Sequence, residues 1–529
     1  MAKKYLSRKY KTEAAKSFKD SFTTNTNRTV GYVYLSKSTS YPDEEEASDI
    51  ADTVSDEKSI WDNMILGKRV SSGDIELVVP FRRWTANTRY KQYDDKQPLD
   101  FLLSESENAG DVVYPMYVIN TQGDVYKCLC NNVSSYSRVE PTGTYTQNQG
   151  FIQTEYLSQP DYLWKYMYNV RFLNKFYTDE WIPVPYGIEQ NQSDYNLNSS
   201  NLVDGALNKI VVSNSGIGYV DTTVNIEPFE INSSTITVSD DIDLDFSNIK
   251  VNMTISGTGI VNGTYITGLV SETKTIRLSS STISAGGGTT ANAVTVSTRV
   301  QILGDGSETV TSVLYSGTSI RKINVTTAGT GYTRADILIY GSGTGATARA
   351  ILPPKYGHGS NPALELGANN TMILCKIGEV DASESGALPT DISFRQYGLL
   401  MKPIKYGESN PVSFANANNI ISQLTNVTVL GGTEYQQNEF VYQGSPTNRT
   451  FEGYVVTQTP TVVKLSNVYG EIKIGSLLNG SNSSVSRPVS AINYPTLEKY
   501  TGSILYNNNI LKVERSEGQS EEIKLVFQF

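Results

Sequence analysis

The chain has 529 residues and a net charge of −10 at pH 7, from 44 Lys and Arg against 54 Asp and Glu. This acidic balance argues against a general nucleic-acid-binding protein, whose surface carries a basic patch. The sequence has no apolar run near the roughly 18 residues of a membrane span, and no apolar signal core follows its basic N-terminus. We therefore expect neither nucleic acid nor membrane among its partners, and a protein made in the cytoplasm.

The composition favours strands over helices. The chain contains 34 Tyr and 42 Gly, is rich in Ser, Thr, Asn and Val, and lacks long stretches of Ala, Leu, Glu and Lys. Tyr, Val and Thr fit a pleated sheet, whereas Gly, Ser and Asn mark turns. The length allows about three or four domains. We predict a mainly β, multi-domain protein with a β-sandwich-like frame, a few short helices and inserted all-β modules.

Residues 1–200 form the first compositional block, and we assign them to the N-terminal part of the frame. They contain all four tryptophans. Short helices are expected over 11–22 and 55–65. The segment DYLWKYMYNV (161–170) alternates aromatic and polar residues too loosely to be assigned. Strands are expected over IELVVPF (75–81), DVVYPMYVI (111–119) and DVYKCLC (124–130).

Residues 201–352 change to Ser/Thr/Asn/Gly-rich repeats, which we predict to be an inserted β region. KIVVSNSGIGYVDTTVNI (209–226) and KINVTTAGTGYTRADILI (322–339) match through their GxGY motifs and flanking apolar positions. A phosphate-binding loop needs a helix directly after its glycines, but strand-like residues follow both motifs. We therefore interpret each motif as a hairpin turn between two strands, with glycine supplying the positive φ.

The rest of the chain is divided by the same criteria. Residues 353–415 return to the frame, residues 416–495 are predicted to be a second small β module, and residues 496–529 complete the frame. The final stretch alternates apolar and polar residues, with Ile523, Leu525, Phe527 and Phe529 on one face. This period of two predicts a strand buried to its last residue. Pairing it in a sheet would join the two chain ends in one frame.

The inventory of catalytic groups is small. His358 is the single histidine, so any Ser-His-Asp or Cys-His arrangement would pass through it. It lies between glycines in an expected loop, where a hydrogen-bonded structural role is the better interpretation. A glycosidase needs only two carboxylates, which spacing alone does not reveal, so that alternative stays open. We predict no catalytic residue and no enzyme.

Metal and cofactor motifs are also missing from the sequence. The three cysteines, Cys128, Cys130 and Cys375, lack the further ligands of a structural zinc site. Three carboxylates at 241, 243 and 245 would share one strand face, but the central Gly and distal Glu of a calcium loop are absent. A solvated strand face explains them better. We predict no metal and no cofactor.

Several segments outside the repeats carry a resemblance to one family. In chain order they are VVPFRRW (78–84), NTRY (87–90), VYKCL (125–129), YLWKYMY (162–168), EWIPVP (180–185), ISFRQYGLLMKP (392–403) and SEEIKLVFQF (520–529). Together they resemble the baseplate wedge subunit encoded by gene eight in contractile-tailed phages of the T-even type. KYGHGSNPALELGA (355–368) is similar to the version in marine cyanobacterial phages.

The resemblance covers about half the chain and has clear departures. The T-even relative is much shorter and lacks anything like 205–352 or 421–493, so these segments look like β modules inserted into a shared frame. YNNNILKV (506–513) also differs from the family's Pro-containing version. The resemblance implies a non-enzymatic virion protein of the tail baseplate. It would form a homodimer, hold neighbouring wedge subunits together and transmit the baseplate rearrangement on host attachment.

Interfaces are enriched in Tyr, Trp and Arg, and one cluster of these types stands out. Arg82, Arg83, Trp84 and Tyr90 are therefore our candidate partner interface. The equally weighted alternative is that Trp84 caps a core while both arginines pair with nearby acids. For the whole protein, the alternative function is a receptor- or carbohydrate-binding tail protein, with the inserted modules contacting the host surface.

Overall fold

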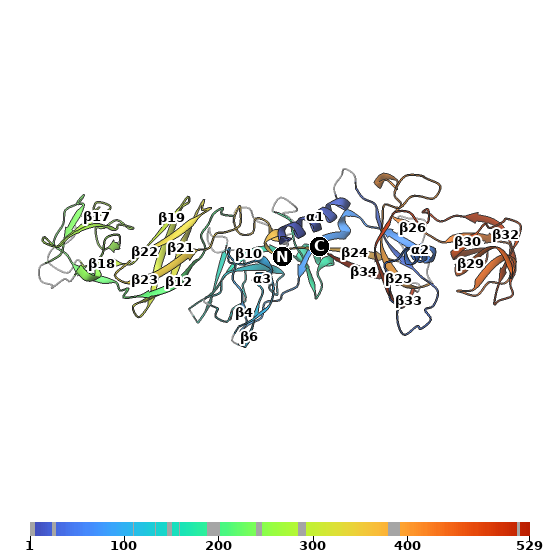
Figure 1. The fold of residues 1–529 in the computed structure, drawn as a ribbon, viewed down its shortest axis with the longest axis horizontal. Coiled ribbons are helices and arrows are strands. Elements are labelled where there is room, and N and C mark those ends of the chain that lie inside the picture. The colour runs from blue at the N-terminus through green and yellow to red at the C-terminus, as the bar shows by residue number, and fades with distance from the viewer. Residues whose placement is uncertain are drawn as a thin grey trace, which may run out of the picture. The chain divides into compact units, whose positions relative to one another are not determined.

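The computed structural model describes residues 6–23, 28–108, 110–132, 134–144, 151–157, 159–187, 202–239, 246–283, 293–378, 392–515 and 519–529. The protein is mainly β with several domains and a few short helices, as predicted (Figure 1). It divides into two compact units. Unit 1 comprises residues 1–79 and 368–529, and unit 2 comprises residues 80–367.

Unit 1 contains two sheets that share one core. The first has the strand order β26-β2-β1-β25-β33, and in the second β24 lies between β3 and β34. Val33, Ile373 and Leu525 belong to a single buried cluster with contributions from both sheets, which gives the β-sandwich-like frame. The strands are Gly31–Ser36 (β1), Met64–Arg69 (β2), Ile75–Pro80 (β3), Asn370–Ile377 (β24), Ile392–Met401 (β25), Ile420–Ser422 (β26), Ser503–Arg515 (β33) and Glu521–Gln528 (β34).

Two helices cover this frame, close to the predicted positions. In α1 (Arg8–Thr23), the buried residues Ala15 and Phe22 lie two turns apart on the same helical face, and α1 packs against β24. In α2 (Val54–Asn63), the Thr53 side chain caps the first turn by accepting from the Asp56 N–H at 3.1 Å. Short 3₁₀ turns lie at Ser72–Asp74 (η1) and Phe414–Asn416 (η5).

The C-terminal strand pairs along its whole length, as predicted. β34 runs antiparallel to β24 from Ile377↔Glu521 to Asn370↔Gln528, and the Phe529 N–H donates to the Asn369 carbonyl at 2.9 Å. Ile523 and Leu525 are buried, whereas Phe527 and Phe529 are only half-buried. The prediction of burial to the last residue is therefore too strong, because β34 is the edge strand of its sheet.

Unit 1 also contains a closed barrel within the range predicted as a second β module (Figure 1). Its strand order is β27-β30-β29-β28-β31-β32, and closure leaves no exposed sheet edge. Val441, Val455 and Leu465 are fully buried in its own core. The strands are Thr425–Val429 (β27), Phe440–Ser445 (β28), Asn448–Gln458 (β29), Val462–Gly470 (β30), Leu477–Gly480 (β31) and Ser486–Asn493 (β32).

Unit 2 begins with two small sheets, ordered β7-β8-β10-β9 and β4-β6-β5. The segment left unassigned by sequence lies in β10, which pairs with β8 and β9. The strand expected over 111–119 is broken at Pro115, which has no N–H for a ladder. The elements are Arg89–Tyr90 (β4), Ser106–Asn108 (β5), Asp111–Tyr114 (β6), Tyr117–Ile119 (β7), Asp124–Cys130 (β8), Phe151–Tyr156 (β9), Gln159–Asn169 (β10), Trp181–Pro183 (β11), Leu99–Leu103 (α3), Arg171–Phe176 (η2) and Pro362–Glu365 (α5).

The inserted region of unit 2 holds two modules with separate cores. The first module has sheets β12-β23-β22-β19 and β20-β21, and the second has sheets β13-β18-β15 and β14-β17-β16. The second lies within the first in sequence. Its elements are Thr222–Asn225 (β13), Thr235–Thr237 (β14), Phe246–Asn248 (η4), Thr254–Ser256 (β15), Ile266–Val270 (β16), Thr275–Leu278 (β17) and Ala293–Ser297 (β18). The first module has Ile210–Ile217 (β12), Arg299–Gly304 (β19), Ser307–Ser316 (β20), Ser319–Thr330 (β21), Ala335–Tyr340 (β22) and Thr344–Ala350 (β23).

The GxGY motifs are not the predicted hairpin turns, because the first two residues of each motif are the last residues of strand β12 or β21. Gly216, Gly218, Gly329 and Gly331 all have positive φ. However, β12 pairs with β23 and β13 with β18, while β21 pairs with β20 and β22 with β19 and β23. Each motif thus carries the chain from one sheet to another. Local alternation indicates strands, but it does not specify which strand each one pairs with.

Two glycines outside the repeat copies, Gly306 and Gly343, make room for the motif tyrosines. Tyr219 and Tyr332 are both buried. A Cβ added to Gly343 would lie 2.4 Å from the Tyr219 ring, and one added to Gly306 would lie 2.4 Å from the Tyr332 ring. These two glycines are therefore required by the packing of the motif tyrosines.

The two ends of the inserted region lie side by side, as predicted. Ile210 faces Ala350 across the β12–β23 ladder, and the Ile351 N–H donates to the Lys209 carbonyl at 2.9 Å. The boundaries between the compact units are placed differently from the predicted domains, since they fall at 79/80 and 367/368. The first of these falls inside the range 1–200 assigned to one part of the frame.

Candidate functional site

Two of the four residues of the candidate partner interface pack in a core, and the other two are more accessible. Tyr90 is buried: its hydroxyl donates to the Thr85 carbonyl at 3.2 Å, and its ring centroid lies 5.6 Å from that of Trp164. Trp84 packs partly against the same core, and its Nε1 donates to Ser137 Oγ at 3.0 Å. These two aromatic side chains therefore support the fold of unit 2, as in the alternative that Trp84 caps a core.

The two arginines of that cluster are more accessible. Arg82 has one carboxylate within reach, with 3.9 Å between its Nη1 and Glu105 Oε1. Arg83 is exposed and lines a cavity of about 270 Å³ together with Arg171 and Tyr177. Of the four predicted residues, Arg83 is thus the exposed one.

A buried charge cluster lies elsewhere in unit 2, and the sequence analysis did not predict it. Lys127, in the middle of β8, is fully buried, and its Nζ lies 2.6 Å from Glu365 Oε2. Because an ammonium group only donates, His358 Nδ1 accepts from the same Nζ at 3.0 Å. The other oxygen of Glu365 accepts from the Gly359 N–H at 2.7 Å, and the Tyr93 ring centroid lies 4.0 Å from Nζ.

The pKa values of this buried charge cluster follow from burial and from the charges inside it. Burial and the Lys127 ammonium lower the pKa of His358 to about 4, so the ring is neutral near pH 7. Burial alone would raise the pKa of Glu365, but Lys127 and the contact with His358 lower it to about 2. Burial and the neighbouring Lys127 lower the pKa of Lys165, on the adjacent strand β10, to about 8.

This arrangement joins distant segments rather than presenting a reactive group. Glu365 belongs to α5 and His358 to the loop before it, so one carboxylate and one ring fasten the segment 355–367 to strand β8. The contacts use both oxygens of the carboxylate and the only acceptor nitrogen of a neutral imidazole. A burial penalty for three polar groups is offset by these mutual contacts.

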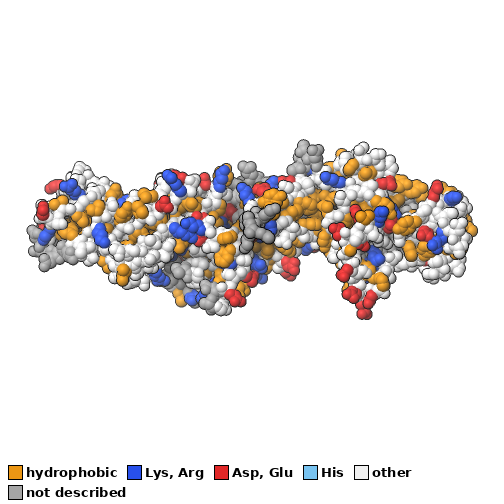
Figure 2. Space-filling model, viewed as in Figure 1, with side chains coloured by type: hydrophobic (Ala, Val, Ile, Leu, Met, Phe, Trp, Pro, Cys, Tyr) orange, Lys and Arg blue, Asp and Glu red, His pale blue; other side chains and the backbone are white. Residues whose placement is uncertain are grey.

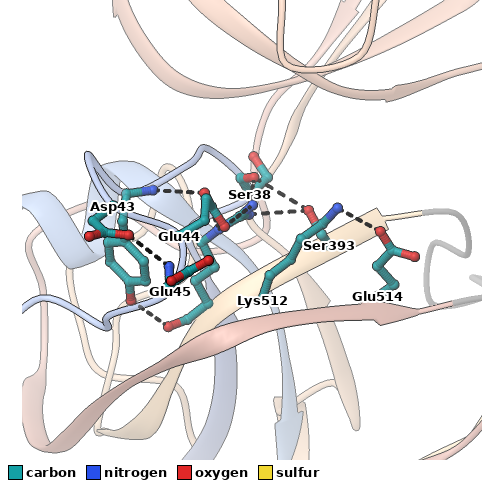
Figure 3. A network of polar contacts seen from close by, with 9 residues as sticks. Ser38, Asp43, Glu44, Glu45, Ser393, Lys512 and Glu514 are labelled. Atoms are coloured by element: carbon teal, nitrogen blue, oxygen red, sulfur yellow. Dashed lines mark hydrogen bonds and ion pairs between the residues drawn. The ribbon is translucent and has the colours of Figure 1, made fainter.

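Unit 1 has an ion pair with one buried partner, Arg395, and one partly exposed partner, Glu44. Glu44 and Ser38 are labelled in the polar network of Figure 3. Arg395 lies in β25 with its side chain 3% exposed, and its Nη2 lies 3.0 Å from Glu44 Oε2. Its Nη1 also donates to the Ser38 carbonyl at 2.6 Å, while the Tyr41 hydroxyl donates to the Arg395 carbonyl at 2.7 Å. The loop after β1 is thereby held on the central sheet of the frame.

A signal for the first cluster was present in the sequence. Lys127 interrupts the otherwise mostly apolar strand DVYKCLC, and a charged residue in the middle of a buried strand requires a partner. Its partners are 231 and 238 positions away, so spacing did not identify them. The carboxylates at 241, 243 and 245 lie outside the described residues.

Metal and membrane features were searched in the described ranges. No group of three or more His, Cys, Asp or Glu side chains in these ranges is arranged to hold a metal ion. None of the helices within them has the length and hydropathy needed to cross a membrane. No known protein-family model matches the sequence, and no curated protein matches it.

Proposed function

We propose that this chain is a structural subunit of a contractile phage tail baseplate, where it holds neighbouring wedge subunits together. The observation that carries the proposal is where the family-like segments lie. VYKCL and YLWKYMY form the paired strands β8 and β10, and KYGHGSNPALELGA supplies His358 and Glu365 to the buried charge cluster on them. EWIPVP meets the same segment, since the Ala363 N–H donates to the Pro185 carbonyl at 3.1 Å.

The same pattern holds in unit 1. ISFRQYGLLMKP covers β25 and SEEIKLVFQF covers β34, and both contribute to one core through Phe394, Leu399 and Leu525. The three regions absent from the family have cores of their own: the two inserted modules and the barrel. Segments that carry the resemblance thus pack with each other, as a shared frame with inserted modules requires.

Ion pairs that fasten loops to sheets suit a part that moves as a rigid body. The contacts of Lys127 and Arg395 connect segments far apart in the chain, so that the loops cannot move independently of the sheets. A baseplate that changes shape on host attachment needs subunits that pass on motion through their interfaces. We propose a homodimer in the virion, made in the host cytoplasm, with other wedge subunits as partners and no catalytic role.

Cross-linking mass spectrometry of purified virions tests this proposal. We expect cross-links from this chain to other wedge proteins and to a second copy of itself. In solution, light scattering should give the mass of two chains, with an interface of more than about 2,000 Å². A chain that is missing from the baseplate, or that cross-links only to fibres at the tail tip, would overturn the proposal.

A receptor-contacting role is the second candidate. Leu303, Val310, Leu314 and Leu338 of the first inserted module are large apolar side chains that remain exposed, and Figure 2 shows hydrophobic atoms on the visible surface of this region. Exposed apolar groups of this kind mark surfaces that meet a partner. Receptor-binding tail proteins are typically trimers, so the mass in solution separates the two candidates.

A further inference from the structure

A cavity of about 380 Å³ opens in unit 1 beside the barrel. One side is formed by barrel residues near the end of β30 and the other by the segment after β32 and by Tyr406. This volume is in the range of small-ligand sites. Its lining is Tyr406, Thr425, Phe451, Val468, Gly470, Glu471, Ile472, Tyr494, Pro495, Leu497, Glu498, Lys499 and Tyr500.

Three accessible tyrosine rings line this cavity. Tyr406, Tyr494 and Tyr500 are 43%, 55% and 50% exposed, which is unusual for aromatic side chains that also line a cavity. The rings of Tyr406 and Tyr494 are stacked, with 4.9 Å between centroids and 9° between planes. The Tyr500 hydroxyl donates to Asp62 Oδ1 at 2.7 Å. The three rings are therefore held in position while much of their surface stays open to solvent.

Two carboxylates, those of Glu471 and Glu498, are among the polar groups that line the cavity. Glu498 Oε2 accepts one long hydrogen bond, 3.4 Å from the Gly407 N–H. The Glu471 carboxylate has no hydrogen-bond or ion-pair partner within the part of the chain that the structure describes. The lining cation, Lys499, is already engaged, with its Nζ 2.8 Å from Asp62 Oδ1 and 3.3 Å from the Val468 carbonyl. Two carboxylates thus remain to accept hydrogen bonds from a ligand.

We propose that this cavity binds a neutral saccharide. A sugar ring offers hydroxyl donors for Glu471 and Glu498, and its C–H groups carry a slight positive charge that is attracted to the negative face of an aromatic ring. An acidic sugar would be repelled by the two carboxylates. A proline-rich peptide also binds aromatic-lined grooves, but its backbone offers carbonyl acceptors and few donors, which does not match a lining of carboxylates.

Saturation-transfer NMR on the full chain tests the proposal directly. The probes are the methyl glycosides of glucose, mannose, galactose and N-acetylglucosamine, together with N-acetylneuraminic acid and a decaproline peptide. We expect transfer to at least one neutral glycoside. Tyr494→Ala should weaken that binding at least about fivefold, as loss of an aromatic contact predicts. Glu498→Gln should weaken it as well, because a carboxylate accepts a stronger hydrogen bond than an amide.

The control variant is Tyr356→Ala, which removes a ring that is 59% exposed and lies in unit 2. It should bind like the unmodified protein. Melting curves establish that each variant is folded. Tyr494 is 55% exposed, so its removal does not open a cavity in the core. Absence of transfer to every neutral glycoside, equal binding by the Tyr494→Ala and unmodified chains, or transfer to decaproline alone would each overturn the proposal.

Discussion

Neutralising Glu365 tests the role of the buried charge cluster. Glu365→Gln keeps the size of the side chain and an oxygen for the Gly359 N–H, but it leaves the Lys127 ammonium without a counter-charge. Both side chains are almost fully buried, at 0% and 4% exposure. Removing one partner of a buried ion pair costs about 3–5 kcal/mol, which is a large share of the roughly 5–15 kcal/mol that stabilises a domain.

Urea unfolding followed by tryptophan fluorescence measures this cost. Three of the four tryptophans, Trp84, Trp164 and Trp181, lie in unit 2, and Trp164 is fully buried in the strand next to Lys127. With a denaturant slope of about 3 kcal/mol/M, the expected loss lowers the midpoint of that transition by roughly 1 M or more. Midpoints are compared because a chain with two units need not unfold in one step.

The matched control is Glu514→Gln. That carboxylate lies 2.5 Å from Lys512 Nζ with its side chain 69% exposed, so we expect no measurable shift. Replacing both members of the buried pair, in Lys127→Met with Glu365→Leu, should recover part of the loss, since no charge is then left unpaired. A Glu365→Gln midpoint equal to that of the control would refute the view that this cluster fastens segment 355–367.

Three further predictions concern pH and the chain's organisation. Because the pKa of His358 is lowered to about 4 in the folded protein from about 6.5 when unfolded, its contribution to stability is complete above pH 6.5 and is lost as the pH falls toward 4. That loss is roughly 3 kcal/mol. Between pH 7 and pH 5, the melting temperature of the His358→Asn variant should therefore fall less than that of the unmodified protein. Equal falls in the variant and the unmodified protein would contradict this. Deleting residues 525–529 removes buried or half-buried Leu and Phe side chains worth about 2–5 kcal/mol each, so the truncated chain should aggregate. Deleting residues 1–5 should leave the melting temperature unchanged. A normal melting temperature for the first truncation would show that β34 is dispensable. Replacing residues 210–350 with a short Gly/Ser linker should leave the frame folded, because the flanking residues Lys209 and Ile351 are already hydrogen-bonded to each other and loop closure costs little. An insoluble protein, or one that no longer forms dimers, would mean that the insertion is integral to the frame.

Local features of the fold were predictable because their causes are local. The helix over 11–22 follows from apolar residues at helical spacing, and the strand at the C-terminus follows from four alternate apolar residues. The positive φ of the GxGY glycines follows from their residue type. The candidate site was predicted less well, since Tyr90 turned out to be a core residue. An aromatic or Arg-rich segment has the same composition whether it lies at an interface or in a core.

The sequence by itself determined that this is a β-rich chain with many turns, because period-two alternation and turn residues act within a few positions of each other. The tertiary structure alone decided which strands pair across the GxGY motifs and that a second module lies within the first. It also decided that Lys127, His358 and Glu365 meet in a buried cluster. Such pairings depend on burial and charge neutralisation between residues hundreds of positions apart, for which adjacent sequence carries no periodic signal.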